Sequence, residues 1–281
     1  MDDAVIRCLG SKICSPFLPR NTSRDDAVCY VSAGTSEIYE CRASDQHVVV
    51  TFTGGEPNGA QVDTQGRIHI ADCGHAAVLR VDDSGQPGLL VKAYEDRTFR
   101  GPSSVAICEN GSIYFTDSGP LGETTLEKPR GSVFCIAASS NGSQLLRPVI
   151  LDALAHPCGL AASEDGKVMF VAELMQNRVL RIVQRPPNAH HVSVFYQFSG
   201  GMGPSCVVVD AHNILYVGHY DFAGSSASTY GKISVISSDG SFLHTLEVPA
   251  PEISGLCLSA DQTFLYVTEV STNCIYKVPV R

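Results

Sequence analysis

Acidic and imidazole side chains recur at matching places along this chain of 281 residues. Each follows a short apolar segment that is typical of a strand: Asp72, Asp117, Glu173, His219 with Tyr220, and Glu269. Carboxylates gathered around a narrow opening repel one another unless a cation or hydrogen-bond donors compensate. Two interpretations stay open: a site for a hard divalent cation, or carboxylates that each hydrogen-bond turn amides of their own unit.

These side chains belong to a repeat of about fifty residues, which is the strongest signal in the sequence. Each unit has a turn-prone opening, a short apolar strand, a polar turn and a second strand, and a third strand follows. Five such units begin near residues 57, 101, 156, 203 and 252. A sixth, more divergent unit precedes them, with strand-like segments CSPFLP, AVCYVSA, EIYECRA and HVVVTF.

The repeat predicts an all-β fold: a six-bladed β-propeller with four-stranded antiparallel blades around a central channel. The last unit has only three strands, and the segment AVIRCLG near the start is predicted to supply the missing outer strand. This pairing would close the ring and remove exposed sheet edges. We expect one domain over 1–281, with blades at approximately 11–55, 56–100, 101–154, 155–201, 202–250, and 251–281 plus 3–9.

The predicted connectivity places the start of the first strand and the end of the second at one mouth of the channel. The long segments 119–131 and 221–231 lie at that mouth, and elaborated loops on a rigid scaffold commonly bind ligands. We therefore expect a small molecule or a protein partner to bind there. The candidate ligand-binding residues are Asn58, Asp72, Ser103, Ser104, Ser205, His219, Tyr220 and Glu269.

Composition narrows the class of protein. The net charge is −9 without a basic run, which argues against nucleic acid or an anionic membrane as the main partner. No apolar run reaches the roughly eighteen residues of a membrane span, and the opening MDDAVIRCLGSK lacks the basic region of a secretory signal. The eleven cysteines are odd in number and form no C-x-x-C pair, so we expect free thiols and a cytoplasmic location.

Two stretches carry a resemblance to a known family. The wording FTDSGPLG at 115–122 and HPCGLAASEDGKVMFVAELMQNRVLRI at 156–182 resembles the family of regucalcin, gluconolactonase and luciferin-regenerating enzyme, which includes senescence-marker-protein-like propellers. The chain is more distantly similar to NHL-repeat and strictosidine-synthase-like propellers. The resemblance implies a metal-dependent lactonase or related esterase, with a divalent cation, often calcium, held by Glu, Asn and Asp side chains at the channel mouth.

The resemblance also shows where this chain departs from the family pattern. The family's Glu-Ser-Pro is matched by Cys14-Ser15-Pro16, its Asn-Gly by Cys158-Gly159, and its aspartate after proline by Ser205. Asp117 and Glu173 do match. Two thiols and a hydroxyl supply neither the charge nor the hard oxygen ligands that calcium prefers.

Three functional hypotheses follow. The replaced ligands favour a non-catalytic binding or scaffold protein, that is, a pseudoenzyme. The alternative is a lactone or ester hydrolase with a site rebuilt around Asp117 and Glu173, holding calcium or manganese. A third is a zinc site, for which the candidate ligands are Cys14, Cys158, Cys206 and His219.

Overall fold

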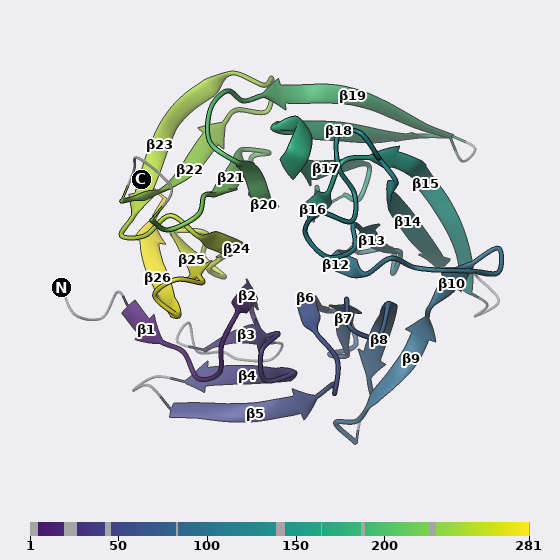
Figure 1. Cartoon of the computed structure of the whole chain (residues 1–281), viewed down its shortest axis with the longest axis horizontal. Helices are drawn as coiled ribbons and strands as arrows, with labels where there is room; N and C mark the ends of the chain where they lie inside the picture. Colours follow the sequence, from purple (N-terminus) through teal and green to yellow (C-terminus); the bar gives the residue numbers. More distant parts are fainter. Residues whose placement is uncertain are drawn as a thin grey trace.

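The computed structural model describes residues 5–19, 27–42, 46–82, 84–138, 144–163, 165–186, 189–224 and 229–280. Six four-stranded antiparallel sheets surround a central channel (Figure 1). The prediction of a six-bladed β-propeller is therefore confirmed.

The first three blades follow the chain in order, each with its first strand nearest the channel and its fourth outermost (Figure 1). Blade one contains β2 (Ile13–Phe17), β3 (Val28–Ser32), β4 (Glu37–Arg42) and β5 (Gln46–Phe52). Blade two contains β6 (Pro57–Val62), β7 (Ile68–Asp72), β8 (Ala77–Val81) and β9 (Pro87–Val91). A hairpin of β10 (Ala93–Tyr94) and β11 (Arg97–Thr98) leads to blade three, with β12 (Pro102–Ile107), β13 (Ile113–Asp117), β14 (Gly131–Ala138) and β15 (Gln144–Leu154).

The remaining blades repeat the same order. Blade four contains β16 (Pro157–Ala162), β17 (Val168–Glu173), the short 3₁₀ helix η2 (Leu174–Gln176), β18 (Arg178–Arg185) and β19 (Ala189–Gln197). Blade five contains β20 (Gly203–Val209), β21 (Leu215–Tyr220), β22 (Gly231–Ile236) and β23 (Phe242–Val248). Blade six contains β24 (Ile253–Leu258), β25 (Phe264–Glu269) and β26 (Cys274–Pro279), and its fourth strand is β1 (Val5–Arg7).

The ring is closed by strands from opposite ends of the described chain. β1 pairs antiparallel with β26, with Val5 opposite Tyr276 and Arg7 opposite Cys274. The amide of Cys8 extends the pairing with a 3.0 Å hydrogen bond to the carbonyl of Asn273. The predicted closure by the N-terminal segment is confirmed, and it gives the outer edge of β26 a hydrogen-bonding partner.

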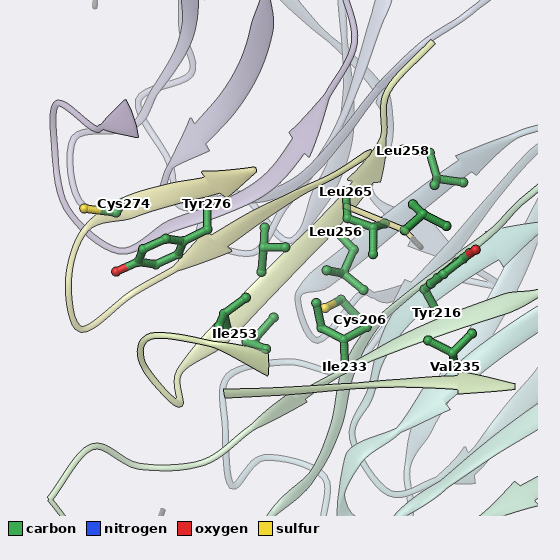
Figure 2. Close-up of a cluster of buried hydrophobic side chains, with 13 residues drawn as sticks. Cys206, Tyr216, Ile233, Val235, Ile253, Leu256, Leu258, Leu265, Cys274 and Tyr276 are labelled. Carbon is green, nitrogen blue, oxygen red and sulfur yellow. The ribbon is translucent and has the colours of Figure 1, made fainter. Parts of the chain in front are cut away.

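The hydrophobic core of the described residues is divided into six clusters, one between each pair of neighbouring blades. Figure 2 shows the cluster between blades five and six, where Tyr216 and Ile233 of blade five lie near Leu256 and Leu265 of blade six. Full burial of such a side chain stabilises the folded state by about 1.5–3 kcal/mol. Because the inner part of each sheet is packed on both faces, second strands such as β13, β17 and β25 are almost wholly buried, whereas outer strands such as β23 are largely exposed.

Glycines let the inner strands approach one another around the channel. A Cβ on Gly159 of β16 would lie 2.8 Å from Cα of Cys206 in the next blade. A Cβ on Gly255 of β24 would lie 2.5 Å from the amide nitrogen of Ser15. Such contacts are too short for any other residue without movement of backbone, so glycine keeps the channel narrow. Among the described residues, the structure contains no helix with the length and apolar character needed to cross a membrane.

Candidate functional site

The carboxylates at the ends of the second strands hold the segment that enters the inner strand of their own blade. Oδ1 of Asp72 accepts a 3.0 Å hydrogen bond from the amide of Glu56, directly before β6. Oδ1 of Asp117 accepts from the amides of Arg100 and Gly101, at 2.9 and 2.8 Å, directly before β12. Burial raises the pKa of Asp117, and these two amides oppose the rise.

Glu173 and Glu269 repeat this arrangement in blades four and six. Oε1 of Glu173 accepts from the amide of Ala155 at 2.7 Å, while Nε of Arg178 donates to Oε2 at 2.7 Å. Glu269 accepts from the amide of Glu252 at 3.0 Å and from turn amides on its other side. Both carboxylates are completely buried. The interpretation in which each acid hydrogen-bonds turn amides of its own blade therefore describes these residues.

The two remaining blades use neutral groups at this position. In blade one, Oγ of Ser32 accepts from the amide of Ser11 at 3.1 Å. In blade five, Nε2 of His219 lies 2.9 Å from Oγ of Ser234, on the next strand of the same blade. Burial lowers the pKa of His219 to about 4, so its imidazole is neutral at pH 7.

The structure does not gather the candidate metal ligands. Within the ranges that the structure describes, no three His, Cys, Asp or Glu side chains form a group able to hold a metal ion. The candidate zinc ligands Cys14, Cys158, Cys206 and His219 thus form no such group, and neither Asp117 nor Glu173 belongs to one. The carboxylates of Asp117 and Glu173 instead each accept at least one backbone amide hydrogen.

A cavity of about 790 Å³ occupies the centre of the ring and is lined by all six inner strands. Five of the candidate ligand-binding residues line it: Asn58, Ser103, Ser104, Ser205 and Tyr220. Asp72, His219 and Glu269 are absent from its described wall, as are Asp117 and Glu173. Its lining includes two exposed charged side chains, Lys12 and Glu56, which lie at the starts of the first two blades.

Small polar side chains lie near the start of the six inner strands around the mouth, and the serine and cysteine side chains among them contact carbonyls of the next blade. We call this set the inner ring: Cys14, Asn58, Ser103, Cys158, Ser205 and Ser254. The hydroxyl of Ser205 donates to the carbonyl of Ile253 at 2.7 Å, and that of Ser254 donates to the carbonyl of Ile13 at 2.7 Å.

The cysteines of the inner ring make the same kind of link. The thiol of Cys158 lies 3.4 Å from the carbonyl of Pro204, and that of Cys14 lies 3.8 Å from the carbonyl of Pro57. Burial raises the pKa of both thiols to about 12, so they are protonated at neutral pH. A protonated thiol is a weak donor rather than a metal ligand. Cys14, Cys158 and Ser205 therefore carry neutral groups that join neighbouring blades.

The rest of the cavity wall is mainly apolar. Aliphatic side chains and one cysteine, located at or just beyond the ends of the six inner strands, line the end away from the mouth: Leu18, Val62, Ile107, Ala162, Val209 and Cys257. At the mouth, Leu121, Leu174, Met202 and Val270 extend this apolar surface. The cavity volume lies in the usual range for small-molecule sites, and a mainly apolar wall with a few polar groups is typical of them.

The loop 119–131 is fixed against blade four. The hydroxyl of Thr124 is completely buried, accepts from the amide of His156 at 3.0 Å and donates to the carbonyl of Ser118 at 3.0 Å. Nε of Arg100 donates to the carbonyl of Arg130 at 3.1 Å. These hydrogen bonds hold the loop in place, and its Leu121 side chain lies half exposed at the cavity mouth.

The loop 221–231 is described only in part, because residues 225–228 lie outside the described ranges. Its described flanks expose Phe222 and Tyr230. Tyr220, just before this loop, lines the cavity, and burial raises the pKa of its phenol to about 12.

Sequence reasoning missed His156, a buried cavity-lining residue directly before β16. Its Nδ1 has no hydrogen-bond partner in the described structure. The sequence did contain a signal for it. His156 precedes Pro157 at the position where blades three and five have glycine before proline, as Gly101 and Gly203.

A family model described as SMP-30/Gluconolactonase/LRE-like region matches residues 22–271. A gluconolactonase of Zymomonas mobilis subsp. mobilis is 31% identical over 121 residues, which are 41% of this chain and 33% of that protein. A protein named lactonase drp35 of Staphylococcus saprophyticus subsp. saprophyticus is 26% identical over 259 residues, 88% of this chain and 74% of that protein. The first of these matches therefore spans only about a third of the relative's own length.

Solved structures resemble the whole ring. A gluconolactonase from Xanthomonas campestris superposes with a TM-score of 0.79 at 22% identity, covering 96% of this chain and 86% of the other. A calcium-binding protein, regucalcin, from Agrobacterium tumefaciens gives a TM-score of 0.75 at 17% identity, covering 99% and 95%. At such identities the likeness shows the fold alone.

Proposed function

Because the chain belongs to the SMP-30/gluconolactonase/LRE-like family, we propose that it uses the central cavity of that fold to bind a small, neutral, largely apolar molecule. The proposal makes it a binding protein without calcium-dependent lactone hydrolysis, and so a divergent, non-catalytic relative of the enzymes that it resembles.

The inner ring carries this proposal. The family resemblance assigns its metal ligands to the positions of Cys14, Cys158 and Ser205. Here these side chains are two protonated thiols and a hydroxyl, and each lies within hydrogen-bonding range of a carbonyl on the next blade. Calcium needs several anionic or carbonyl oxygens, so this donor set does not fit it.

A lactonase that depends on a cation uses it to polarise the lactone carbonyl or to activate water. The carboxylates that the alternative hydrolase would need, Asp117 and Glu173, accept backbone amides and lie outside the described cavity wall. A general base must come within hydrogen-bonding reach of the proton that it removes. The arrangement therefore favours binding over hydrolysis.

The character of the cavity indicates the ligand class. Apolar side chains form most of its wall, and the charged side chains on its described lining are exposed rather than enclosed. An ionic ligand would lose its hydration without gaining a buried counter-charge, which is costly. A neutral molecule avoids that cost and gains about 25 cal/mol for each Å² of apolar surface removed from water.

The proposal is tested by returning the family's ligand types to this chain. We expect wild-type protein to show no change in thermal unfolding with millimolar calcium and no lactone hydrolysis. We expect the triple variant Cys14→Glu, Cys158→Asn, Ser205→Asp to gain calcium-dependent stabilisation of about 2.7 kcal/mol at a calcium concentration 100 times its Kd. The matched control Cys14→Gln, Cys158→Asn, Ser205→Asn fills similar volumes without the charges and should not respond.

Two results would count against the proposal. One is calcium-dependent stabilisation of the wild-type protein. The other is hydrolysis of a lactone by the wild-type protein with a kcat/KM above about 10⁴ M⁻¹ s⁻¹, the lower end of the range for enzymes. Loss of that hydrolysis in Asp117→Asn or Glu173→Gln variants would then favour the rebuilt hydrolase.

A further inference from the structure

The His156 side chain lies in the wall of the central cavity, and its Nδ1 has no hydrogen-bonding partner among the described residues. Its exposed fraction is 8%, and Nδ1 is enclosed with no described donor or acceptor in reach. Its backbone is held on both sides: the amide donates to Oγ1 of Thr124 at 3.0 Å, and the carbonyl accepts from the amide of Leu174 at 3.1 Å. The fold therefore fixes the residue while leaving this ring nitrogen unsatisfied.

The backbone at His156 is unfavourable for a residue with a side chain. Its φ is 59°, in the left-handed region, whereas the equivalent positions of blades three and five are Gly101 and Gly203, with φ of 147° and 134°. A left-handed residue other than glycine costs roughly 1–2 kcal/mol. An unpartnered buried polar group costs about 1–3 kcal/mol more. Two unfavourable features thus coincide at one cavity-lining residue, a pattern that is common at ligand sites.

The chemical state of His156 limits what can bind to it. Burial lowers the pKa of the imidazole to about 4, so the ring is neutral at pH 7 and offers one N–H donor and one lone pair. The cavity wall near the mouth includes Leu121, Leu174 and Met202, together with the protonated thiol of Cys158. A neutral hydroxyl can pair with such a ring either by donating to the nitrogen with the lone pair or by accepting from the N–H, while an apolar body contacts the aliphatic wall.

We propose that His156 anchors a subsite for a neutral molecule that carries a hydroxyl group on an apolar aromatic or alicyclic body. The subsite rests on the proposed function, because it requires the cavity to bind neutral apolar molecules. It adds the group that orients the ligand: the hydroxyl pairs with the imidazole at the mouth, and the apolar body extends toward the far end of the cavity.

The test compares two probes that differ in one hydroxyl group, 2-naphthol and naphthalene. Both fluoresce, and the chain contains no tryptophan to interfere. Their dissociation constants are measured by fluorescence titration of wild-type protein at pH 7. We expect 2-naphthol to bind about tenfold more tightly than naphthalene, which corresponds to one net hydrogen bond. The substitution His156→Phe keeps an aromatic ring and removes both nitrogens, so the ratio should fall to about one.

Two further variants keep the test decisive. His219→Phe removes a half-buried neutral imidazole that lies outside the described cavity wall, and its ratio should stay near the wild-type value. If His156→Phe does not fold, His156→Asn serves instead, because asparagine tolerates the left-handed backbone. Its ratio should also fall, since the amide is shorter than the imidazole.

The outcomes separate the subsite from the proposed function. A wild-type ratio near one, or an unchanged ratio in the folded His156 variant, overturns the subsite while binding of both probes still supports a neutral apolar cavity. If neither 2-naphthol nor naphthalene binds, both proposals are overturned.

Discussion

Two sets of polar side chains at the mouth have different hydrogen-bonding roles: the carboxylates at the ends of the second strands, which we call the rim, and the inner ring. On the rim, the ionisable carboxylates of Asp72, Asp117, Glu173 and Glu269 are buried and accept amides of their own blade. In the inner ring, small neutral groups face the channel axis and link adjacent blades. Carboxylates therefore hold the entrance segments of four blades, whereas the inner-ring side chains carry no charge.

This difference shows how a propeller can keep its architecture while its chemistry changes. Carboxylates that accept the amides at the entrance of a blade can stabilise the fold whatever the cavity binds. Inner-ring residues need only a short side chain with a hydrogen-bond donor, and serine and cysteine both meet that need at several blades. A repeated acid in such a fold is thus weak support for a metal site.

The largest expected effect is on a rim carboxylate. Glu173→Ala leaves the buried amide of Ala155 without an acceptor and Arg178 without its partner. We expect the free energy of unfolding, measured by urea titration, to fall by about 3 kcal/mol. Glu123→Ala removes the exposed partner of Arg100 and should cost less than about 1 kcal/mol. Similar losses for the two variants would remove the contrast between the rim and the surface.

A second effect depends on pH. Burial lowers the pKa of folded His156 to about 4, below its ordinary value of 6.5, so the unfolded chain binds more protons between these values. Its contribution is complete above pH 6.5 and is lost as the pH falls toward 4, by at most about 1.4 kcal/mol per pH unit. His156→Asn should therefore show a shallower loss of unfolding free energy than wild type from pH 6.5 to 4.5. If the unfolding free energies of the two proteins fell in parallel with pH, the imidazole of His156 would not be buried in its neutral form.

The smallest expected effect is on the inner ring. Ser254→Ala removes a 2.7 Å hydrogen bond between blade six and the carbonyl of Ile13 in blade one. We expect the free energy of unfolding to fall by about 1 kcal/mol, and the affinity for naphthalene to stay within twofold of wild type. A loss as large as that of Glu173→Ala would mean that the inner ring, rather than the rim, holds the blades in place.

The architecture was predictable because each blade repeats one pattern of apolar strands and polar turns. Even the divergent first blade could be identified, since Val28–Ser32 and Glu37–Arg42 keep that pattern although its first strand is short. The closing strand Val5–Arg7 followed from a missing partner rather than from its own residues. Strand period and repeat length are properties that a single sequence carries directly.

The site was harder to predict because orientation is not visible in the repeat. Asp117 and Ser103 lie at the same mouth, yet only Ser103 reaches the cavity wall. The difference arises because the end of each second strand turns its side chain toward the incoming loop. His156 was overlooked because its unusual backbone and its unpaired nitrogen exist only in three dimensions.

The pairing of β1 with β26 has a consequence for how the protein is made. β1 emerges from the ribosome among the earliest strands, and its partner is synthesised only after every other strand of the ring. Until β26 is synthesised, β1 has no strand to pair with. Contacts between residues so distant in sequence form slowly. We therefore expect sealing of the ring to be the last step of maturation. A partly made chain would be an open arc with blade five at its growing edge, the form most exposed to aggregation.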